Sequence, residues 1–320
     1  MGTGGARTGG VTGTSGGTTG TAGGTVGQGG SGTGGLAGQG GSGTGGSAGR
    51  DGGTGQGGRD AGGVGGQTTG TGGSRPDGGF GGSTGTGGGT GTTFNPCPTT
   101  AGTACKIMPL GDSITEGYGS SGADGGGPAN QGGYRIELFR QSVTNGKNLT
   151  FVGNLTNGPT TVSNKPFPQK HEGHGGWTIS QIAGIADGTL SSNSPHIVIL
   201  KIGTNDVNGS GATSAPTNLK NLINQITKDA PSALLVVSSI IPIQDDNTNQ
   251  KVKTYNATIP TTVNEAATAG KHVIFVDSYA AFVADSSYKT KYMSDNLHPN
   301  DTGYKLLGQT FYGAISAVLP

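Results

Sequence analysis

Glycine makes up about half of the first 93 residues, and this excess limits where the chain can fold. Of the 70 glycines in the sequence, 45 precede Phe94, and most of the residues between them are Thr, Ser, Gln and Ala. Such a segment has almost no apolar surface to bury, so burial cannot offset the entropy lost on ordering it. We therefore expect residues 1–93 to be a disordered linker and residues 94–320 to form one folded domain.

Charge and hydropathy exclude two classes of partner. The formal net charge is +1, and no basic stripe with interleaved aromatic residues occurs, so we expect no nucleic-acid partner. No apolar run approaches the roughly 18 residues that a membrane helix needs. The residues after Met1 also lack the apolar segment of a secretory signal peptide. We expect the chain to be a monomer.

The only two cysteines, Cys97 and Cys105, lie in a turn-rich stretch at the start of the predicted domain. A short-loop disulfide between them is the favoured interpretation. Two free or buried thiols, or a thiol redox pair, are the alternatives, although the spacing is not that of a C-x-x-C site. A disulfide would favour an extracellular location.

Five continuously apolar runs have the composition of parallel strands that are covered on both faces. They occupy residues 106–111, 149–153, 196–203, 233–241 and 272–278. Between and after them, apolar residues recur at helical spacing. These are Leu219, Leu222, Ile223 and Ile226 in one segment, and Tyr304, Leu307, Phe311 and Ile315 behind a cap at Asn300. The alternation predicts a doubly wound, three-layer α/β/α sandwich around a five-stranded parallel sheet.

Polar residues follow several of these runs at the point where each strand should end. Ser113 follows the first run in GDSIT, and Asn205 follows the third in GTND. Asp295 and His298, in SDNLH, come after the fifth run, and the HEGHGGW stretch at 171–177 comes after the second. Because ligands bind beyond the carboxyl ends of the strands in open α/β sheets, we expect these four segments to meet at one edge.

Ser113, His298 and Asp295 together would form a nucleophilic catalyst. A hydroxyl becomes a nucleophile when a base takes its proton, and a carboxylate fixes the tautomer of that base. The order of the three along the chain is acceptable, because geometry defines such a triad. Each residue also has a plainer explanation, since a serine after a strand often caps a helix or occupies a turn. Their joint position at one sheet edge favours catalysis.

Attack on an ester creates an oxyanion, which needs hydrogen-bond donors placed in advance. We expect these donors to be the N–H of Ser113, the N–H of Gly173 and the side-chain amide of Asn205. Gly175 and Gly176 remain alternatives for the glycine. We also expect substrate contacts from two further residues, Asp112 and Trp177. The indole is a candidate platform for a sugar ring, and packing of Trp177 in the core is an equal alternative.

These blocks resemble the SGNH or GDSL hydrolases, whose pattern combines a Ser in a GDS block, an oxyanion-hole Gly, an Asn in a G-x-N-D block and a D-x-x-H block. The resemblance covers residues 104–320 and implies a flavodoxin-like α/β/α fold. GGYR at 132–135 and HEGHGGWTI at 171–179 are similar to carbohydrate esterase family three, whose members deacetylate xylan. The resemblance therefore implies a secreted serine esterase that acts on small acyl esters, chiefly acetyl, of plant cell-wall polysaccharide.

Other functions remain open at this point. One is a lipase, thioesterase or other small-ester hydrolase on the same fold, and another is a non-catalytic carbohydrate-binding module. HEGH lacks the two-residue gap of the H-E-x-x-H zinc helix. DDNTN at 245–249 lacks the Gly and Glu of a calcium loop, so we interpret it as a surface loop. We expect no metal ion and no cofactor.

Overall fold

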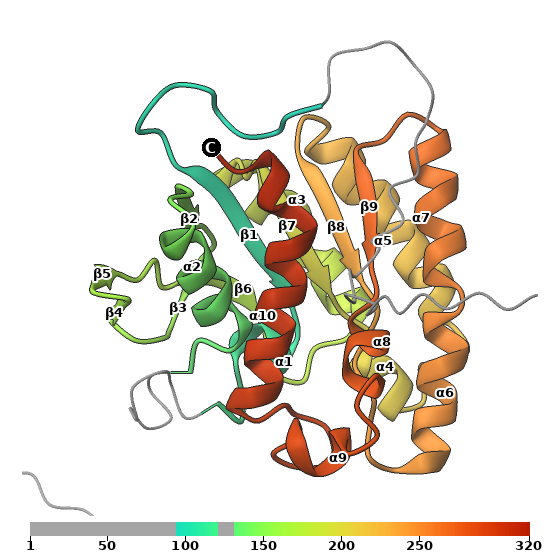
Figure 1. The fold of residues 1–320 in the computed structure, drawn as a ribbon. Coiled ribbons are helices and arrows are strands. Elements are labelled where there is room, and N and C mark those ends of the chain that lie inside the picture. Colours follow the sequence, from blue (N-terminus) through green and yellow to red (C-terminus); the bar gives the residue numbers. More distant parts are fainter. Residues whose placement is uncertain (1–93, 121–130) are drawn as a thin grey trace, which may run out of the picture. The chain divides into compact units, whose positions relative to one another are not determined.

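The structure, a computed structural model, describes residues 94–120 and 131–320, and the linker predicted for residues 1–93 lies outside the described residues. A twisted, mostly parallel sheet runs through the middle of the described part, with helices on both faces (Figure 1). The α/β sandwich predicted from the alternating pattern is confirmed.

All five predicted strands are present, and all but β1 are shorter than predicted. They are β1 (Cys105–Gly111), β2 (Leu149–Phe151), β7 (Ile197–Lys201), β8 (Leu234–Ser238) and β9 (Val273–Val276). They lie in the order β2-β1-β7-β8-β9 and pair in parallel. Every residue of β7 and β8 is buried, as expected of central parallel strands with helices on both faces.

Four short strands were not predicted. The strand β6 (Lys170–Gly173) pairs in parallel with the carboxyl half of β1, while β2 pairs with its amino half. β3 (Leu155–Thr156) pairs antiparallel with β6, and β4 (Thr161–Val162) with β5 (Lys165–Pro166) forms a separate ribbon. The KHEG sequence of β6 is too short and polar to read as a strand. Its pairing places the HEGHGG stretch directly beside the end of β1.

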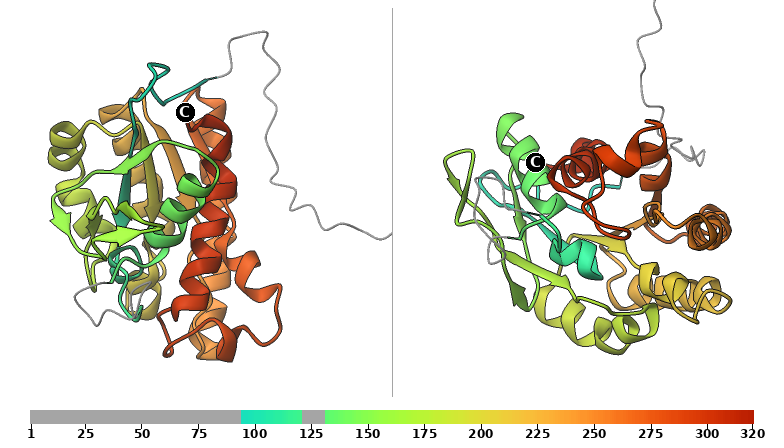
Figure 2. Two further views of the ribbon diagram at one scale, coloured as in Figure 1. Left: turned by 60° about the vertical axis from the view of Figure 1, so that its left-hand side comes forward. Right: turned by 90° about the horizontal axis from the view of Figure 1, so that it is seen from below.

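Alternate residues of the central strands belong to two separate apolar clusters. Figure 2 shows the helices that cover the two faces of the sheet. Ile107 and Ile199 pack with helices α2 (Tyr134–Thr144), α8 (Ser278–Val283) and α10 (Asp301–Ile315). Met108 and Leu200 pack on the opposite face, with helices α3 (Ile179–Asn193), α5 (Ala215–Asp229), α6 (Asp246–Asn256) and α7 (Ile259–Thr268). Helices thus cover both faces of the sheet, so a reactive site can form only at the ends of its strands.

Both predicted apolar helix stripes are confirmed, because all their members are buried in α5 and α10. Asn300 caps α10 as predicted, and its side chain accepts a hydrogen bond from Gly303 N at 3.0 Å. The surface loop predicted for residues 245–249 is wrong. Asp245 caps α6 there by accepting from Thr248 N at 2.8 Å, a capping pattern that the comparison with a calcium loop obscured.

Short elements complete the described part: α1 (Ser113–Glu116), α4 (Thr204–Asn208), α9 (Tyr288–Lys291) and a final 3-10 turn, η2 (Ser316–Val318). Cys97 and Cys105 form the predicted disulfide, which ties the start of the described domain to β1. None of the helices in residues 94–120 and 131–320 is long and apolar enough to cross a membrane.

Candidate active site

The turn from β1 into α1 explains each residue of the GDS block. A Cβ on Gly111 would lie 2.1 Å from the carbonyl oxygen of Lys201, so the close approach of β1 and β7 requires glycine. Asp112 caps α1, because its Oδ1 accepts from Ile114 N at 3.0 Å. Ser113 is therefore held as the first residue of a short helix, directly beyond the carboxyl end of the central strand.

The structure brings together the three residues predicted to form the triad. Ser113 Oγ lies 3.0 Å from His298 Nε2, and His298 Nδ1 lies 2.9 Å from Asp295 Oδ2. Ser113 is 6% exposed, whereas the side chain of Asp295 is 47% exposed, so the array runs from the protein interior toward solvent. The imidazole between them has one ring nitrogen for the hydroxyl and one for the carboxylate.

The carboxylate of Asp295 also builds the turn that carries the histidine. Its Oδ1 accepts from the backbone N–H groups of Leu297, at 2.7 Å, and His298, at 2.6 Å. Partial burial raises the pKa of Asp295, but these two hydrogen bonds and the contact with the His298 ring lower it below its ordinary value overall. The carboxylate is ionised at neutral pH and favours a proton on Nδ1, which leaves the Nε2 lone pair facing Ser113.

The structure places two of the predicted oxyanion donors, Ser113 and Asn205, just beyond the carboxyl ends of β1 and β7. The N–H of Ser113 belongs to the first turn of α1, where backbone donors have no partner within the helix. Asn205, in α4 just beyond the end of β7, is half-buried, and its Nδ2 donates to Trp177 O at 2.8 Å. An amide nitrogen carries two hydrogens, so the second N–H of Asn205 remains for an oxyanion.

Gly173 does not suit the role of oxyanion donor that the sequence predicted. Its N–H donates to Nδ1 of His171 at 3.0 Å, inside the protein. Burial and the nearby charge of Arg135 lower the pKa of His171 to about 2, so the ring is neutral and remains an acceptor. Gly175 and Gly176 are both exposed, and neither N–H makes a hydrogen bond within the described residues. We infer that one of these two glycines supplies the third donor.

Gly173 is required for packing instead. A Cβ there would lie 2.2 Å from Glu116 N, in the backbone of α1. We expect Gly173→Ala to lower the free energy of unfolding by about 3 kcal/mol, because neither backbone can yield easily. Gly184→Ala is the matched control: it lies in α3 with open space around its Cα, and we expect roughly 0.5–1 kcal/mol of stabilisation. Urea unfolding of both variants checks this, and equal stabilities would contradict the tight contact.

Asp112 is not placed to bind substrate, contrary to the prediction. Its side chain is fully buried, one oxygen caps α1, and the other has no hydrogen-bond partner in the described structure. The side chain of Lys201 is also fully buried: burial lowers the pKa of Lys201, and the charge of Asp112 opposes that shift. Asp112 thus supports the turn from beneath.

Trp177 is half-buried, and its contacts agree with the second of the two alternatives, packing in the core. Its ring stacks on the imidazole of His174, with centroids 4.0 Å apart and planes 16° apart, and it packs against the core around α3 and α5. Nε2 of His174 in turn lies 3.0 Å from Oε2 of the buried Glu172. These side-chain contacts, from Glu172 through His174 to Trp177, therefore hold in place the loop that contains Gly175 and Gly176. No pattern in the sequence predicted this Glu172–His174 pair.

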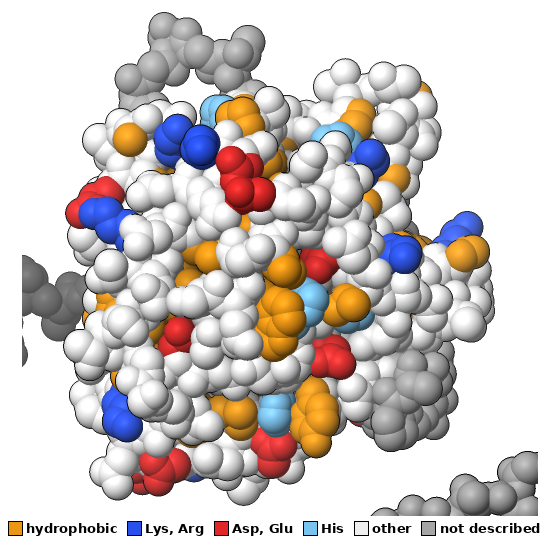
Figure 3. Space-filling model, turned by 180° about the vertical axis from the view of Figure 1, so that it is seen from behind, with side chains coloured by type: hydrophobic (Ala, Val, Ile, Leu, Met, Phe, Trp, Pro, Cys, Tyr) orange, Lys and Arg blue, Asp and Glu red, His pale blue; other side chains and the backbone are white. Residues whose placement is uncertain are grey.

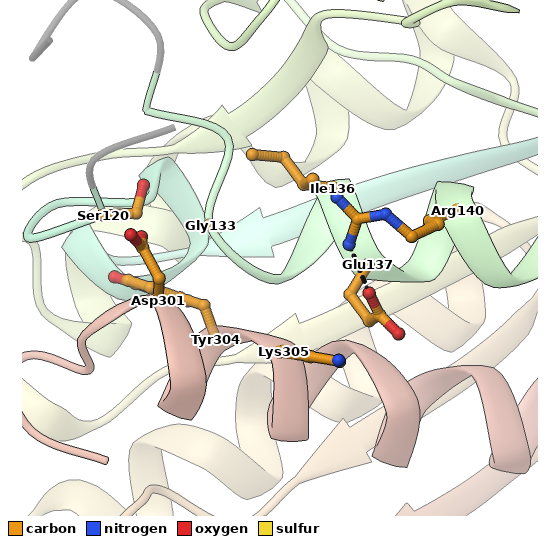
Figure 4. A pocket seen from close by; sticks show the side chains of 8 residues that line it. All are labelled: Ser120, Gly133, Ile136, Glu137, Arg140, Asp301, Tyr304 and Lys305. Atoms are coloured by element: carbon orange, nitrogen blue, oxygen red, sulfur yellow. Dashed lines mark hydrogen bonds and ion pairs between the residues drawn. The ribbon is translucent and has the colours of Figure 1, made fainter. Parts of the chain in front are cut away.

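The pocket in Figure 4 is separate from these residues. It has a volume of about 170 Å³ and is lined by Ser120, Gly133 and side chains of α2 and α10, including Glu137, Asp301 and Lys305. None of the triad residues lines it. On the face shown in Figure 3, the Lys and Arg side chains of the described residues are scattered and form no basic patch. The part of the chain that the structure describes also contains no group of three or more His, Cys, Asp or Glu suited to a metal ion.

The fold and the array at its sheet edge define the class, an ester hydrolase with an SGNH-type α/β/α architecture. The chain belongs to the GDSL-like Lipase/Acylhydrolase family, whose pattern matches residues 110–306. This match covers the GDS block, the G-x-N-D block and the D-x-x-H block.

The proteins to which this chain is similar include two carbohydrate esterases of family 3 and a multidomain esterase. A family 3 carbohydrate esterase from Clostridium thermocellum is 35% identical with a TM-score of 0.57, over 68% of this chain and 98% of that one. A carbohydrate esterase family 3 structure from Talaromyces cellulolyticus is 25% identical with a TM-score of 0.55, over 67% and 98% of the two chains. A multidomain esterase of Ruminococcus flavefaciens is 30% identical over 246 residues, which make up 69% of this chain but only 29% of that protein.

Proposed function

We propose that this protein is a serine esterase that removes small acyl groups, chiefly acetyl, from plant cell-wall polysaccharide such as xylan. The observation that carries the proposal is the hydrogen-bonded series Ser113, His298 and Asp295 at the carboxyl edge of the sheet. Similarity to a family 3 carbohydrate esterase over nearly its whole length supports the substrate class. The Cys97–Cys105 disulfide supports a location outside the cell.

The proposed reaction begins with attack of Ser113 Oγ on the ester carbonyl carbon. The hydroxyl proton passes to Nε2 of His298, and Asp295 stabilises the resulting imidazolium. The negative charge on the carbonyl oxygen is held by the N–H of Ser113, the free N–H of Asn205 and a glycine N–H of the 175–176 loop. His298 then returns the proton to the leaving sugar oxygen as the C–O bond breaks, leaving an acyl group on Ser113.

The second half of the reaction restores the enzyme. His298 takes a proton from water, whose oxygen attacks the acyl carbon of the Ser113 ester. Collapse of this second tetrahedral intermediate releases the carboxylic acid, and Ser113 Oγ regains its proton from His298. The two halves together consume one water molecule and one ester and release the alcohol and the carboxylic acid.

Replacement of Asn205 tests the oxyanion site. We expect Asn205→Ala to lower kcat by about 10²–10³, the usual effect of losing one such donor. Asn208→Ala is the control, since Asn208 is an exposed residue of the same helix, and its activity should equal that of the wild type. Steady-state kinetics on 4-nitrophenyl acetate separate the cases: a rise in KM alone would make Asn205 a substrate-binding residue.

The substrate class is tested by release of acetate from acetylated xylan, compared with acetylated chitin oligomers and pectin. We expect the highest kcat/KM on the xylan. A parallel comparison of acetyl and octanoyl esters of one chromophore should favour acetyl. Preference for octanoyl, with no acetate released from any of the carbohydrates, would replace the proposal by a lipase-like function of the same triad.

A further inference from the structure

We propose that Tyr118 is the aromatic platform of a sugar-binding subsite directly beside the triad, an inference that rests on the proposed function. Tyr118 follows α1 and is 51% exposed. It is the most exposed of three large hydrophobic side chains exposed in the described residues, the others being Leu155 and Val283. Exposure of a single aromatic residue is ordinary in itself, so its position carries the inference.

The ring of Tyr118 lies against the imidazole of His298. The ring centroids are 4.5 Å apart and the planes are tilted by 52°. His298 accepts and returns the proton of every proposed step, so the exposed part of the Tyr118 ring borders the space where the leaving alcohol must sit. In the proposed substrate that alcohol is a hydroxyl of a sugar ring.

The backbone of Tyr118 is fixed although its side chain is exposed. Tyr118 N donates to Ser113 O at 2.9 Å, and its carbonyl accepts from the hydroxyl of the buried Tyr304 at 2.6 Å. The next residue, Gly119, has φ +87° and packs so tightly that a Cβ would lie 2.7 Å from Ser294 Oγ and 3.2 Å from His298 Cβ. A rigid backbone that presents an aromatic ring to solvent costs little further entropy on binding.

The chemistry of tyrosine suits a sugar ring. One side of a pyranose presents C–H groups that pack on an aromatic face, and the phenol hydroxyl can bond a sugar hydroxyl at the rim. Trp177, which the sequence analysis named as a candidate for this role, has its ring stacked on His174 and packed on the core. Tyr118 instead has no aromatic contact other than His298 among the described residues.

A competing role for Tyr118 is to hold the His298 ring in place without touching substrate. Loss of such support would lower turnover of every ester by a similar factor. Loss of a sugar platform would instead raise KM for a carbohydrate ester more than for a small one. The ratio of kcat/KM values on two substrates therefore separates the two roles, because any effect common to both substrates cancels.

The test measures the full chain on acetylated xylo-oligosaccharide and on 4-nitrophenyl acetate. Tyr118→Leu keeps apolar cover beside His298 but removes the flat ring, and Tyr118→Phe keeps the ring. We expect Tyr118→Leu to lower the ratio of kcat/KM for the oligosaccharide to that for 4-nitrophenyl acetate about tenfold, mainly through KM. Tyr118→Phe should keep the ratio within about threefold of the wild type. The control Leu155→Ala, another exposed apolar residue, should leave it unchanged.

An unchanged ratio in Tyr118→Leu would overturn the inference, whether or not both activities fall. The wild-type chain separates this failure from failure of the proposed function. If the wild type hydrolyses 4-nitrophenyl acetate but releases no acetate from the oligosaccharide, the proposed substrate class is wrong and the sugar platform is rejected with it.

Discussion

Ser113→Ala should abolish turnover and leave the fold intact. Ser113 Oγ is the attacking atom, and loss of a serine nucleophile lowers kcat by about 10⁴–10⁶. The hydroxyl bonds only His298 among the described residues, and α1 is capped by Asp112 rather than by Ser113, so the change removes little structural support. Hydrolysis of 4-nitrophenyl acetate and the thermal midpoint measure the two effects.

Ser180→Ala provides the control for this substitution. Ser180 is exposed in α3, at the start of the helix that follows the HEGHGG loop, and its loss should change neither activity nor stability measurably. Residual activity of Ser113→Ala above about one per cent of the wild type would reject a serine mechanism at this position.

Asp295→Asn should give the second large loss, up to about 10⁴ in kcat/KM. The asparagine Oδ1 can still accept from the backbone N–H groups of Leu297 and His298, so the turn should persist. Its amide NH₂ would then face Nδ1 of His298, and the ring would have to carry its proton on Nε2. In that tautomer the nitrogen beside Ser113 cannot act as a base.

The pH dependence of the free energy of unfolding should differ between the wild type and Asp295→Asn. The pKa of Asp295 lies below its ordinary value, which is about 3.9. Its stabilising contribution is therefore complete above the unfolded-state pKa and is lost as the pH falls through the lower folded-state pKa. In acid unfolding, Asp295→Asn should therefore lack the loss of stability that protonation of Asp295 causes in the wild type.

A fall in kcat/KM of less than tenfold in Asp295→Asn would show that another group orients His298. Such a result would remove Asp295 from the triad but would leave the role of Ser113 unchanged.

The sequence predicted the centre of this site because the triad depends on topology. Parallel strands bring their carboxyl ends to one edge, so residues after β1 and after β9 meet although 185 positions separate Ser113 from His298. The apolar runs marked those strands clearly, and the helical stripes of α5 and α10 fixed the two covering layers. Local capping signals such as Asn300 were equally readable.

The errors arose where a side chain's direction depends on distant packing. Spacing in the sequence favours Gly173, but strand β6, which no sequence pattern predicts, turns the N–H of Gly173 inward to His171. Asp112 lies next to the nucleophile in the chain, yet its side chain is fully buried and one of its carboxylate oxygens caps α1. No sequence pattern marks Tyr118 as a site residue, because only the fold places it beside His298.

Reaction with a fluorophosphonate, followed by peptide mapping, tests the central claim most directly. Such a reagent forms a stable phosphonyl ester with a serine that a neighbouring base activates. We expect one adduct per chain, located on Ser113 by fragmentation, with loss of esterase activity in proportion to labelling. Acetylated xylo-oligosaccharide should slow the labelling, and His298→Ala should prevent it. Loss of activity with the adduct on another residue, or full activity after complete labelling of Ser113, would contradict Ser113 as the nucleophile.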